Sequence, residues 1–362
     1  RSEMEAILTK LGCHMEGDDI LIPTFRPDLE HKADIAEEIA RFYGYNKITS
    51  TSIKGGAQGK YTARQKFDRT ISETMLALGL SEIMTYSFIS PRYYDKIRMP
   101  ADHPLRRSVV ISNPLGEDTS VMRTVALPSM LETLARNYNN RNASAHLFEL
   151  AREYIPTTDN ELPVEKNKLI GGIYGEGVDF FTVKGIVEDL LDRVSVYGYD
   201  VEADATAYSY HPGRCAKLTI DGEELGVLGE IHPTVAENYG ISGRVYAFTL
   251  DTDVMFRHTC TERQYHPLPK FPAVTRDLAL ICADAIPVLT LEKAISKAAG
   301  SLLESIKLFD VYKGKQIAEG KKSVAFSITL RSADSTLTDE TASATVAKVI
   351  KALEDLGATL RS

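Results

Sequence analysis

The chain has 362 residues, of which 43% are hydrophobic and 25% are charged, and this suggests two or three globular domains and excludes a disordered or fibrous protein. A net charge of -8 argues against a protein that coats nucleic acid as a whole. The charge is uneven, because residues 264–362 carry 13 basic and 11 acidic residues while residues 1–263 carry 29 and 39. No apolar run approaches the roughly 18 residues of a membrane span.

The first sixty residues contain the densest group of acids. Residues 1–12 have the apolar spacing of a helix, residues 20–22 form a short strand, and a second helix begins at Asp34 and ends at Gly44. We expect the polar, glycine-rich segment 50–61 to be a linker. It lacks the Ser or Thr that follows the lysine of a phosphate-binding loop.

Four carboxylates lie at the start of the second helix: Asp28, Asp34, Glu37 and Glu38. Crowded oxygen ligands of this kind suit a hard cation such as magnesium. The alternative is that these acids complement the helix dipole, with Asp34 as the cap. Glu30 is a further acid nearby. Spacing alone leaves both interpretations open.

The segment 109–154 is the unit around which we expect the middle of the chain to be organised. It is predicted as a strand at 109–111, a turn at 113–116, an amphipathic helix containing Leu127 to Tyr138, and a strand at 145–154, all within one antiparallel unit. A helix at 62–78 and a strand at 82–88 precede it.

After this unit the pattern predicts further strands and helices. These are a strand at 169–174, a helix at 183–196, a hairpin at 214–230 that turns at 221–224, a short helix from His232, and a strand at 245–250. Residues 60–253 are therefore predicted to form a large antiparallel sheet flanked by helices.

The last hundred residues change pattern. Strands at 277–281, 303–312, 323–331 and 358–360 alternate with helices at 290–299 and from 338 to 357. Two strand-helix-strand repeats are typical of a ferredoxin-like plait.

Several segments, in order along the chain, resemble the C-terminal part of the bacterial phenylalanine-tRNA ligase beta subunit family. They are RPDLEHKADIAEEIARFYGYNKI, LGLSEIMTYSF, NPLGEDTSVMRT, LARNYNNR, LFELAREY, DFFTVKG, YHPGRCAKL, GVLGEIHP and FPAVTRDLAL. The resemblance implies an α+β fold with three modules. These are a winged-helix-like magnesium domain at 1–53, a noncatalytic core similar to class II synthetases with an antiparallel sheet at 60–253, and a ferredoxin-like anticodon-binding (FDX-ACB) domain at 268–362.

The resemblance also implies cofactors and partners. The family pattern D-x5-D-x2-E-E matches Asp28, Asp34, Glu37 and Glu38 as ligands of Mg2+ shared with the alpha subunit. The family assembles as an alpha-beta pair doubled to a heterotetramer, binds tRNA(Phe), and uses ATP in the alpha subunit. Four scattered cysteines without a CxxC pair indicate reduced residues of a cytoplasmic protein, in preference to a metal or disulfide set.

We expect no catalytic residues in this chain. Class II sites hold ATP phosphates with arginines in fixed motifs, and Arg152 and Arg214 lack that context. Arg123 and Arg136 could hold a ligand, although structural roles are commoner for such arginines.

For RNA contact in the plait, the basic candidates are Arg276, Lys313, Lys315, Lys321 and Arg331. The aromatic candidates are Tyr312, Phe309 and Phe326, of which we expect Phe309 and Phe326 to pack in the core.

The family's N-terminal half, with its editing domain, is not represented in this sequence, so we expect no editing. Two other functions remain open. One is a free-standing RNA-binding or scaffold protein built from the same modules, and the other is an independent ATP-dependent ligase.

Overall fold

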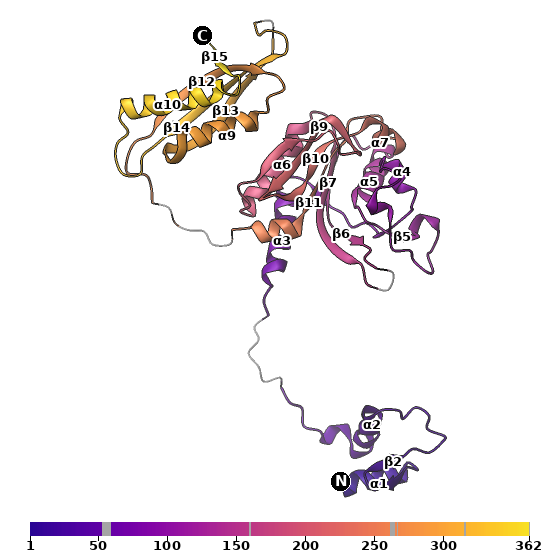
Figure 1. Ribbon diagram of the computed structural model, residues 1–362. Helices are drawn as coiled ribbons and strands as arrows, with labels where there is room; N and C mark the ends of the chain where they lie inside the picture. The colour runs from indigo at the N-terminus through magenta and orange to yellow at the C-terminus, as the bar shows by residue number, and fades with distance from the viewer. Residues whose placement is uncertain (53–58, 159–160, 261–264, 266, 315, 362) are drawn as a thin grey trace. The chain divides into compact units, whose positions relative to one another are not determined.

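The structure, a computed structural model, describes residues 1–52, 59–158, 161–260, 265, 267–314 and 316–361. These divide into two compact units, Arg1–Lys60 and Tyr61–Ser362. The fold class predicted from the sequence, α+β with antiparallel sheets, is confirmed (Figure 1). The centre of the expected linker, residues 53–58, lies outside the described residues.

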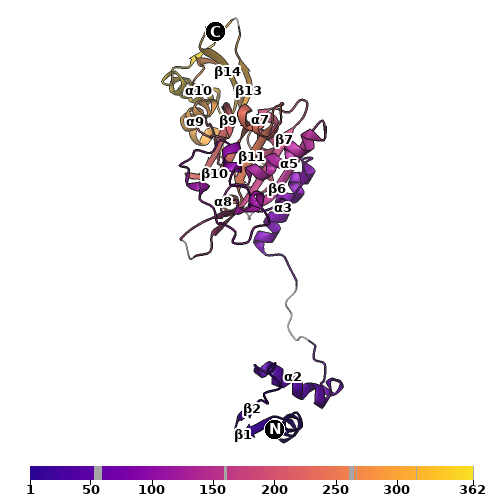
Figure 2. The ribbon, with the colours of Figure 1, turned by 90° about the vertical axis from the view of Figure 1, so that its right-hand side faces the viewer.

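The first unit combines two helices with a hairpin that only partly matched expectation (Figure 2). Its elements are α1 (Ser2–Lys10), β1 (His14–Glu16), β2 (Asp19–Leu21) and α2 (Lys32–Tyr43). The sequence pattern missed β1, which pairs with β2 across a turn at Gly17, where φ is +66°. A positive φ is available to glycine at little steric cost.

The core of the second unit is a seven-stranded sheet. In order across the sheet its strands are β3 (Ser81–Glu82), β6 (Ala145–Ile155), β7 (Val164–Tyr174), β11 (Tyr246–Asp251), β10 (Glu223–Ile231), β9 (Tyr210–Ile220) and β8 (Asp200–Ala203). All neighbours are antiparallel except β3 and β6, which run parallel. The hairpin turn between β9 and β10 is shorter than expected: it contains only Asp221 and Gly222, both with positive φ.

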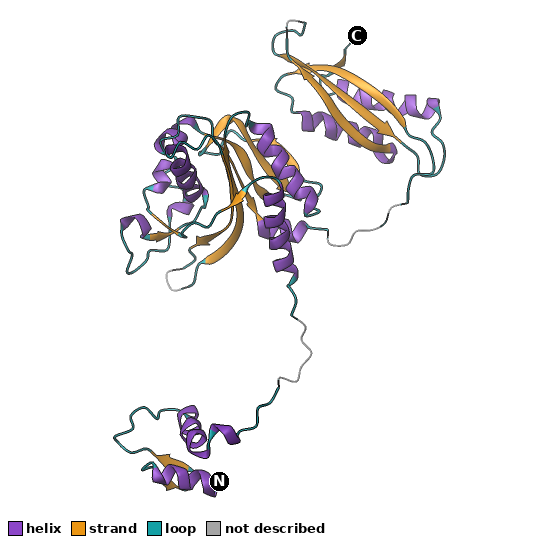
Figure 3. Ribbon diagram, turned by 180° about the vertical axis from the view of Figure 1, so that it is seen from behind, coloured by secondary structure: helices purple, strands orange, loops and turns teal. Residues whose placement is uncertain are grey.

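Helices cover both faces of this sheet (Figures 1 and 3). One face packs against α4 (Tyr93–Lys96), α5 (Leu127–Asn139) and α7 (Pro233–Asn238). The other packs against α3 (Ala63–Ala77), α6 (Phe180–Arg193) and α8 (Thr252–His258). Successive residues of β7 point to opposite faces of the sheet. Leu169 packs on the face covered by α3, α6 and α8, and Ile170 packs on the face covered by α4, α5 and α7.

The helix α5 approaches β7 closely because Gly172 has no side chain. A Cβ atom at Gly172 would lie 2.5 Å from Cδ1 of Leu134 and 2.8 Å from Cγ of Met130. Both of these α5 side chains are fully buried. The face of the sheet under α5 is therefore filled by helix side chains.

The predicted single antiparallel unit over 109–154 is wrong. Residues 109–111 do not form a strand: Val110 makes one isolated bridge to Val121 and is 73% exposed, so no buried face favours a longer ladder. The strand β5 (Val121–Met122) pairs with β4 (Phe88–Ile89) in a separate two-stranded sheet. Only α5 and β6 of the expected unit belong to the core sheet.

The strand expected at 82–88 is divided into β3 and β4. Between them, the N–H of Ile83 donates to the carbonyl of Phe148, but Thr85 bonds to the Glu149 side chain instead of a strand backbone. Side chains distant in sequence thus replace the expected ladder.

The plait has a four-stranded sheet in the order β13-β14-β12-β15. Its elements are β12 (Val274–Ala283), α9 (Val288–Ala299), β13 (Leu303–Tyr312), β14 (Lys321–Leu330), α10 (Asp339–Glu354) and β15 (Thr359–Leu360). Both helices cover one face and enclose a separate hydrophobic cluster (Figure 3). Short 3-10 helices occur at Tyr45–Lys47, Pro104–Arg106, Glu117–Thr119 and Gly300–Leu302.

Across the described ranges, no helix combines the length and the apolar character needed to cross a membrane.

Replacing Gly172 by alanine should destabilise the core by about 1–3 kcal/mol, because the new methyl group overlaps Leu134 and Met130. Urea unfolding monitored by circular dichroism measures this. The control is Gly185→Ala in α6, where no heavy atom lies within 4 Å of the added carbon. Alanine there should stabilise by about 0.5–1 kcal/mol. Equal effects of the two substitutions would contradict the packing described.

Candidate functional site

Asp34 lies at the third position of α2, not at its cap. Its Oδ2 atom accepts hydrogen bonds from the backbone N–H of Glu30, at 2.9 Å, and of His31, at 2.7 Å. His31 is the N-cap residue, so the capping role expected for Asp34 is exercised from within the helix.

Arg26 links two of the other predicted ligands. Its Nη2 atom lies 2.7 Å from Oδ2 of Asp28 and 3.1 Å from Oε1 of Glu38. Arg41 also binds Glu38, with Nε 3.0 Å from Oε1. The hydrogen bonds from Arg41 and then Arg26 lower the pKa of Glu38 to about 2, and the bond from Arg26 lowers the pKa of Asp28.

These carboxylates do not fit a directly coordinated magnesium ion in this arrangement. Within the described ranges, no three acidic, histidine or cysteine side chains gather into a group that could hold a metal. Glu37 is exposed, Asp34 holds backbone N–H groups, and the guanidinium of Arg26 occupies the cation position between Asp28 and Glu38. The magnesium site stays a prediction.

Arg123 is a buried structural residue. Its side chain donates to the carbonyl of Arg152 at 2.9 Å, to Oγ1 of Thr85 at 2.7 Å and to Oε1 of Glu149 at 2.9 Å. Arg123 is 1% exposed and Glu149 is 4% exposed. Every part of this guanidinium is engaged by the protein, so it offers no site for a phosphate.

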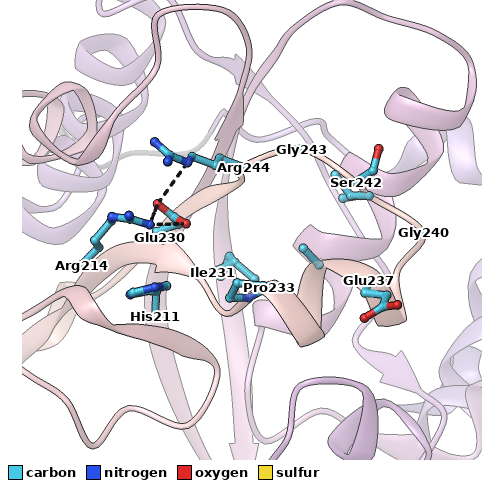
Figure 4. A pocket seen from close by; sticks show the side chains of 12 residues that line it. His211, Arg214, Glu230, Ile231, Pro233, Glu237, Gly240, Ser242, Gly243 and Arg244 are labelled. Carbon is cyan, nitrogen blue, oxygen red and sulfur yellow. Dashed lines mark hydrogen bonds and ion pairs between the residues drawn. The ribbon is translucent and has the colours of Figure 1, made fainter.

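Arg214 is also engaged by a carboxylate, in a pocket of about 650 Å³ at the ends of β9 and β10 (Figure 4). Its Nη1 atom lies 3.0 Å from both carboxylate oxygens of Glu230, which is 3% exposed and also accepts a hydrogen bond from Tyr246. Nε of Arg244 lies 3.9 Å from the same carboxylate. Arg152 pairs with Glu165 at 2.6 Å.

The basic candidates in the plait do not form one patch. Lys321 begins β14 and Arg331 follows its end, and ten residues of strand span about 33 Å. Arg276 pairs with Asp339 of α10, Lys313 pairs with Asp284, and Arg331 pairs with Glu304. Lys321 is exposed, and Lys315 lies outside the described residues.

The face of the plait opposite its helices carries a different set. Residues paired across an antiparallel ladder share a face, and Tyr312 is paired with Ser323 and Lys307 with Ser327. Lys321 lies on this face by alternation from Ser323. We call the accessible part of this face, Lys307, Tyr312, Lys321 and Ser327, the open face.

The two phenylalanines that were expected to pack in the core, Phe309 and Phe326, differ in the structure. Phe326 is fully buried, as expected, whereas Phe309 is 53% exposed, so its expected core packing is wrong. Phe309 lies at a register shift between Leu308 and Asp310, which removes it from the inward alternation. The sequence analysis missed Lys307, because the face of a residue beyond a bulge cannot be counted without knowing the bulge.

Family comparisons agree with this architecture. Residues 1–45 match the tRNA synthetase B5 domain, residues 48–252 match the phenylalanyl tRNA synthetase beta chain CLM domain, and residues 269–361 match the ferredoxin-fold anticodon binding domain.

Curated relatives match over nearly the whole chain. The phenylalanine–tRNA ligase beta subunit of Clostridium tetani is 46% identical over 97% of this chain and 45% of its own length. That of Clostridium acetobutylicum is 44% identical over 100% of this chain and 46% of its own length. The chain thus spans about half the length of these relatives.

Among solved structures, pyrrolysyl-tRNA synthetase from Desulfitobacterium hafniense is similar over 53% of this chain and 68% of its own, with a TM-score of 0.45 and 12% identity, too distant to add to the assignment. The family assignment rests on the sequence relatives. The resemblance inferred from the motifs is confirmed, and the chain belongs to the phenylalanine–tRNA ligase beta subunit family.

Proposed function

We propose that this chain is a noncatalytic part of a cytoplasmic phenylalanine–tRNA ligase, which supports a catalytic alpha subunit and binds tRNA(Phe) during ATP-dependent phenylalanylation. The relatives' name, beta subunit, supports the existence of a second kind of chain. The observation that carries the proposal is an apolar stripe at the edge of the core sheet.

The apolar stripe consists of Met84, Tyr86 and Phe88, which are 96%, 78% and 40% exposed. The residues between them, Thr85 and Ser87, are less exposed. Alternation of this kind presents three large side chains on the solvent side of an extended segment. Grouped exposed apolar side chains are typical of protein interaction sites.

The backbone beside the stripe supports the same interpretation. The order of the sheet ends at β3, so the segment that follows β3 lies at the edge. Ile83 and Ser87 bond inward, to Phe148 and Arg123, whereas Met84 and Tyr86 make no backbone hydrogen bond to the described part of the chain. An edge with free N–H and C=O groups can pair with another chain.

The engaged arginines support assigning ATP chemistry to the other subunit. A phosphate-binding arginine needs a free, correctly placed fork of donors. Arg123 is satisfied internally, and Arg214 is held by Glu230. The substrates would therefore be held by the alpha chain, and this chain would fix the position of that subunit.

Replacing Met84 and Tyr86 together by lysine should weaken association with the catalytic alpha subunit about tenfold or more, because two charges would be buried against its surface. Co-purification after co-expression, followed by sedimentation analysis, measures this. The control is Phe181→Lys, since Phe181 is 73% exposed but lies on α6.

All variants should melt like the wild type, because the changed side chains are exposed. An assembled complex that tolerates the double lysine variant would contradict the docking role. A chain that stays free of the alpha subunit and binds unrelated RNA would favour the free-standing RNA-binding function instead.

For tRNA(Phe), we propose contact at the open face of the plait. Tyr312 is 38% exposed and can stack on a base, while Lys307 and Lys321 can reach phosphates. Asp277 and Asp310 share this face by their pairing with Ser327 and Ala325. Their charges offset the lysines, so stacking would contribute much of the affinity.

Tyr312→Leu should weaken tRNA(Phe) binding about tenfold, since stacking on an aromatic ring contributes roughly 1–3 kcal/mol per base. Filter binding with the full chain and its alpha partner measures this. Arg276→Gln serves as the control, because Arg276 faces α10 and pairs with Asp339. A larger loss from Arg276→Gln than from Tyr312→Leu would move the RNA surface to the helical side.

Magnesium can be tested through Arg26. If Asp28 and Glu38 are ligands, Arg26→Gln should tighten Mn2+ binding, because the competing guanidinium is gone. Titration calorimetry measures this, and Lys10→Gln in α1 is the control. Without the partner, we expect EDTA to leave the melting temperature unchanged. If neither the wild type nor Arg26→Gln binds Mn2+, with or without the alpha subunit, the predicted ligands are wrong.

A further inference from the structure

A second polar pocket is lined by residues from α4, α5 and the end of α7. These helices lie on one face of the core (Figure 1). The volume of the pocket is about 280 Å³, at the lower end of the range for small-molecule sites, so it suits a sugar and phosphate better than a larger ligand. Its lining includes Lys96, Glu132, Arg136, Asn238 and Tyr239. It is separate from the apolar stripe and from the open face, and the name α5–α7 pocket is kept for it below.

Two buried polar atoms of this pocket lack hydrogen-bond partners in the described part of the chain. They are the hydroxyl oxygen of Tyr239 and Oε2 of Glu132. Tyr239 is only 5% exposed, and leaving such a group without a partner costs about as much as a lost hydrogen bond. Oε2 of Glu132 has an ion-pair partner in Lys96, 3.6 Å away, so the hydroxyl of Tyr239 is the stronger sign of a missing ligand, because buried polar groups are almost always satisfied.

The chemistry of the two atoms restricts that ligand. The phenol of Tyr239 can donate, whereas an ionised carboxylate such as Glu132 can only accept. A ligand hydroxyl can accept from the phenol and donate to the carboxylate at the same time. A phosphate oxygen has no proton to give, and its negative charge would be repelled by the carboxylate of Glu132.

The two cations of the pocket, Lys96 and Arg136, differ in the contacts that they make with the protein. Lys96 is held in place: its Nζ atom lies 4.8 Å from the ring centre of Tyr239, 5.1 Å from that of Tyr93 and 3.6 Å from Oε2 of Glu132. Arg136, one turn after Glu132 on α5, is exposed, and its guanidinium makes no hydrogen bond or ion pair to the residues that the structure describes. Arg136 leaves one uncompensated positive charge at the rim.

We propose that the α5–α7 pocket binds one nucleotide of an RNA strand, with the ribose 2′-hydroxyl between Tyr239 and Glu132 and the neighbouring phosphate at Arg136. The hydroxyl distinguishes RNA from DNA, because only the ribose has it. The exposed amides of Asn139 and Asn140 beside Arg136 add donors for the sugar-phosphate backbone. The proposal rests on the proposed function only in taking tRNA as the source of the strand.

The test uses fluorescence anisotropy of the full chain with a single-stranded RNA and the DNA of the same sequence. Both are measured in a background carrying Lys307→Gln, Tyr312→Leu and Lys321→Gln, so that the plait contributes little. We expect RNA to bind more tightly than DNA. Tyr239→Phe should weaken RNA binding about fivefold, the effect of one hydrogen bond, and leave DNA binding unchanged.

Arg136→Gln should weaken RNA and DNA alike and reduce the salt slope by about one. The control is Arg193→Gln, an exposed arginine of α6 on the other face of the sheet. Tyr239→Phe removes a buried hydroxyl that has no partner, so the variant should fold, and its melting temperature checks this.

An RNA-to-DNA ratio that Tyr239→Phe leaves unchanged would overturn the proposal and would leave a bound water as the occupant. The proposed tRNA function is tested separately by Tyr312→Leu, so the two can fail independently. Unchanged tRNA binding in Tyr312→Leu would count only against the open face, and an unchanged RNA-to-DNA ratio in Tyr239→Phe would count only against the pocket.

Discussion

The contact between α5 and β7 is the constraint on which the core depends. Because Gly172 has no side chain, Met130 and Leu134 can lie directly on the strand. The sheet is then covered by helices on both faces, with α3, α6 and α8 on the other side. The part of each sheet face that lies under these helices is therefore filled by side chains.

The buried network around Arg123 determines how the edge of the sheet is presented. Arg123 joins Thr85, Glu149 and the carbonyl of Arg152, which lie far apart in sequence. Removing one partner of such a buried pair is strongly destabilising, because the other charge would be left unpaired. The network holds the inward side of the 83–88 segment and thereby turns Met84 and Tyr86 outward.

The sequence was sufficient where the information is local. The helices α3 and α10 follow from apolar spacing and from the caps Thr62 and Thr338, and the ferredoxin-like order follows from alternating strands and helices. The strand breaks near Thr85 were not predictable, since they depend on Glu149, 64 residues away.

The candidate sites show the same difference between features set by local sequence and features set by contacts between distant residues. Spacing alone grouped Asp28 with Glu38, but it gave no sign that Arg26 folds between them, because a loop side chain has no fixed periodicity. In the plait, the register shift beside Phe309 puts Lys307 and Tyr312, which lie on either side of it, on one face, and this could be found only from the pairing of the strands.

The exposed edge beside β3 has a consequence for how the protein must be produced. A chain made in excess over any partner carries uncovered strand backbone and large apolar side chains in water, which is the combination that promotes aggregation. An isolated preparation of the chain would then need low concentration to remain in solution.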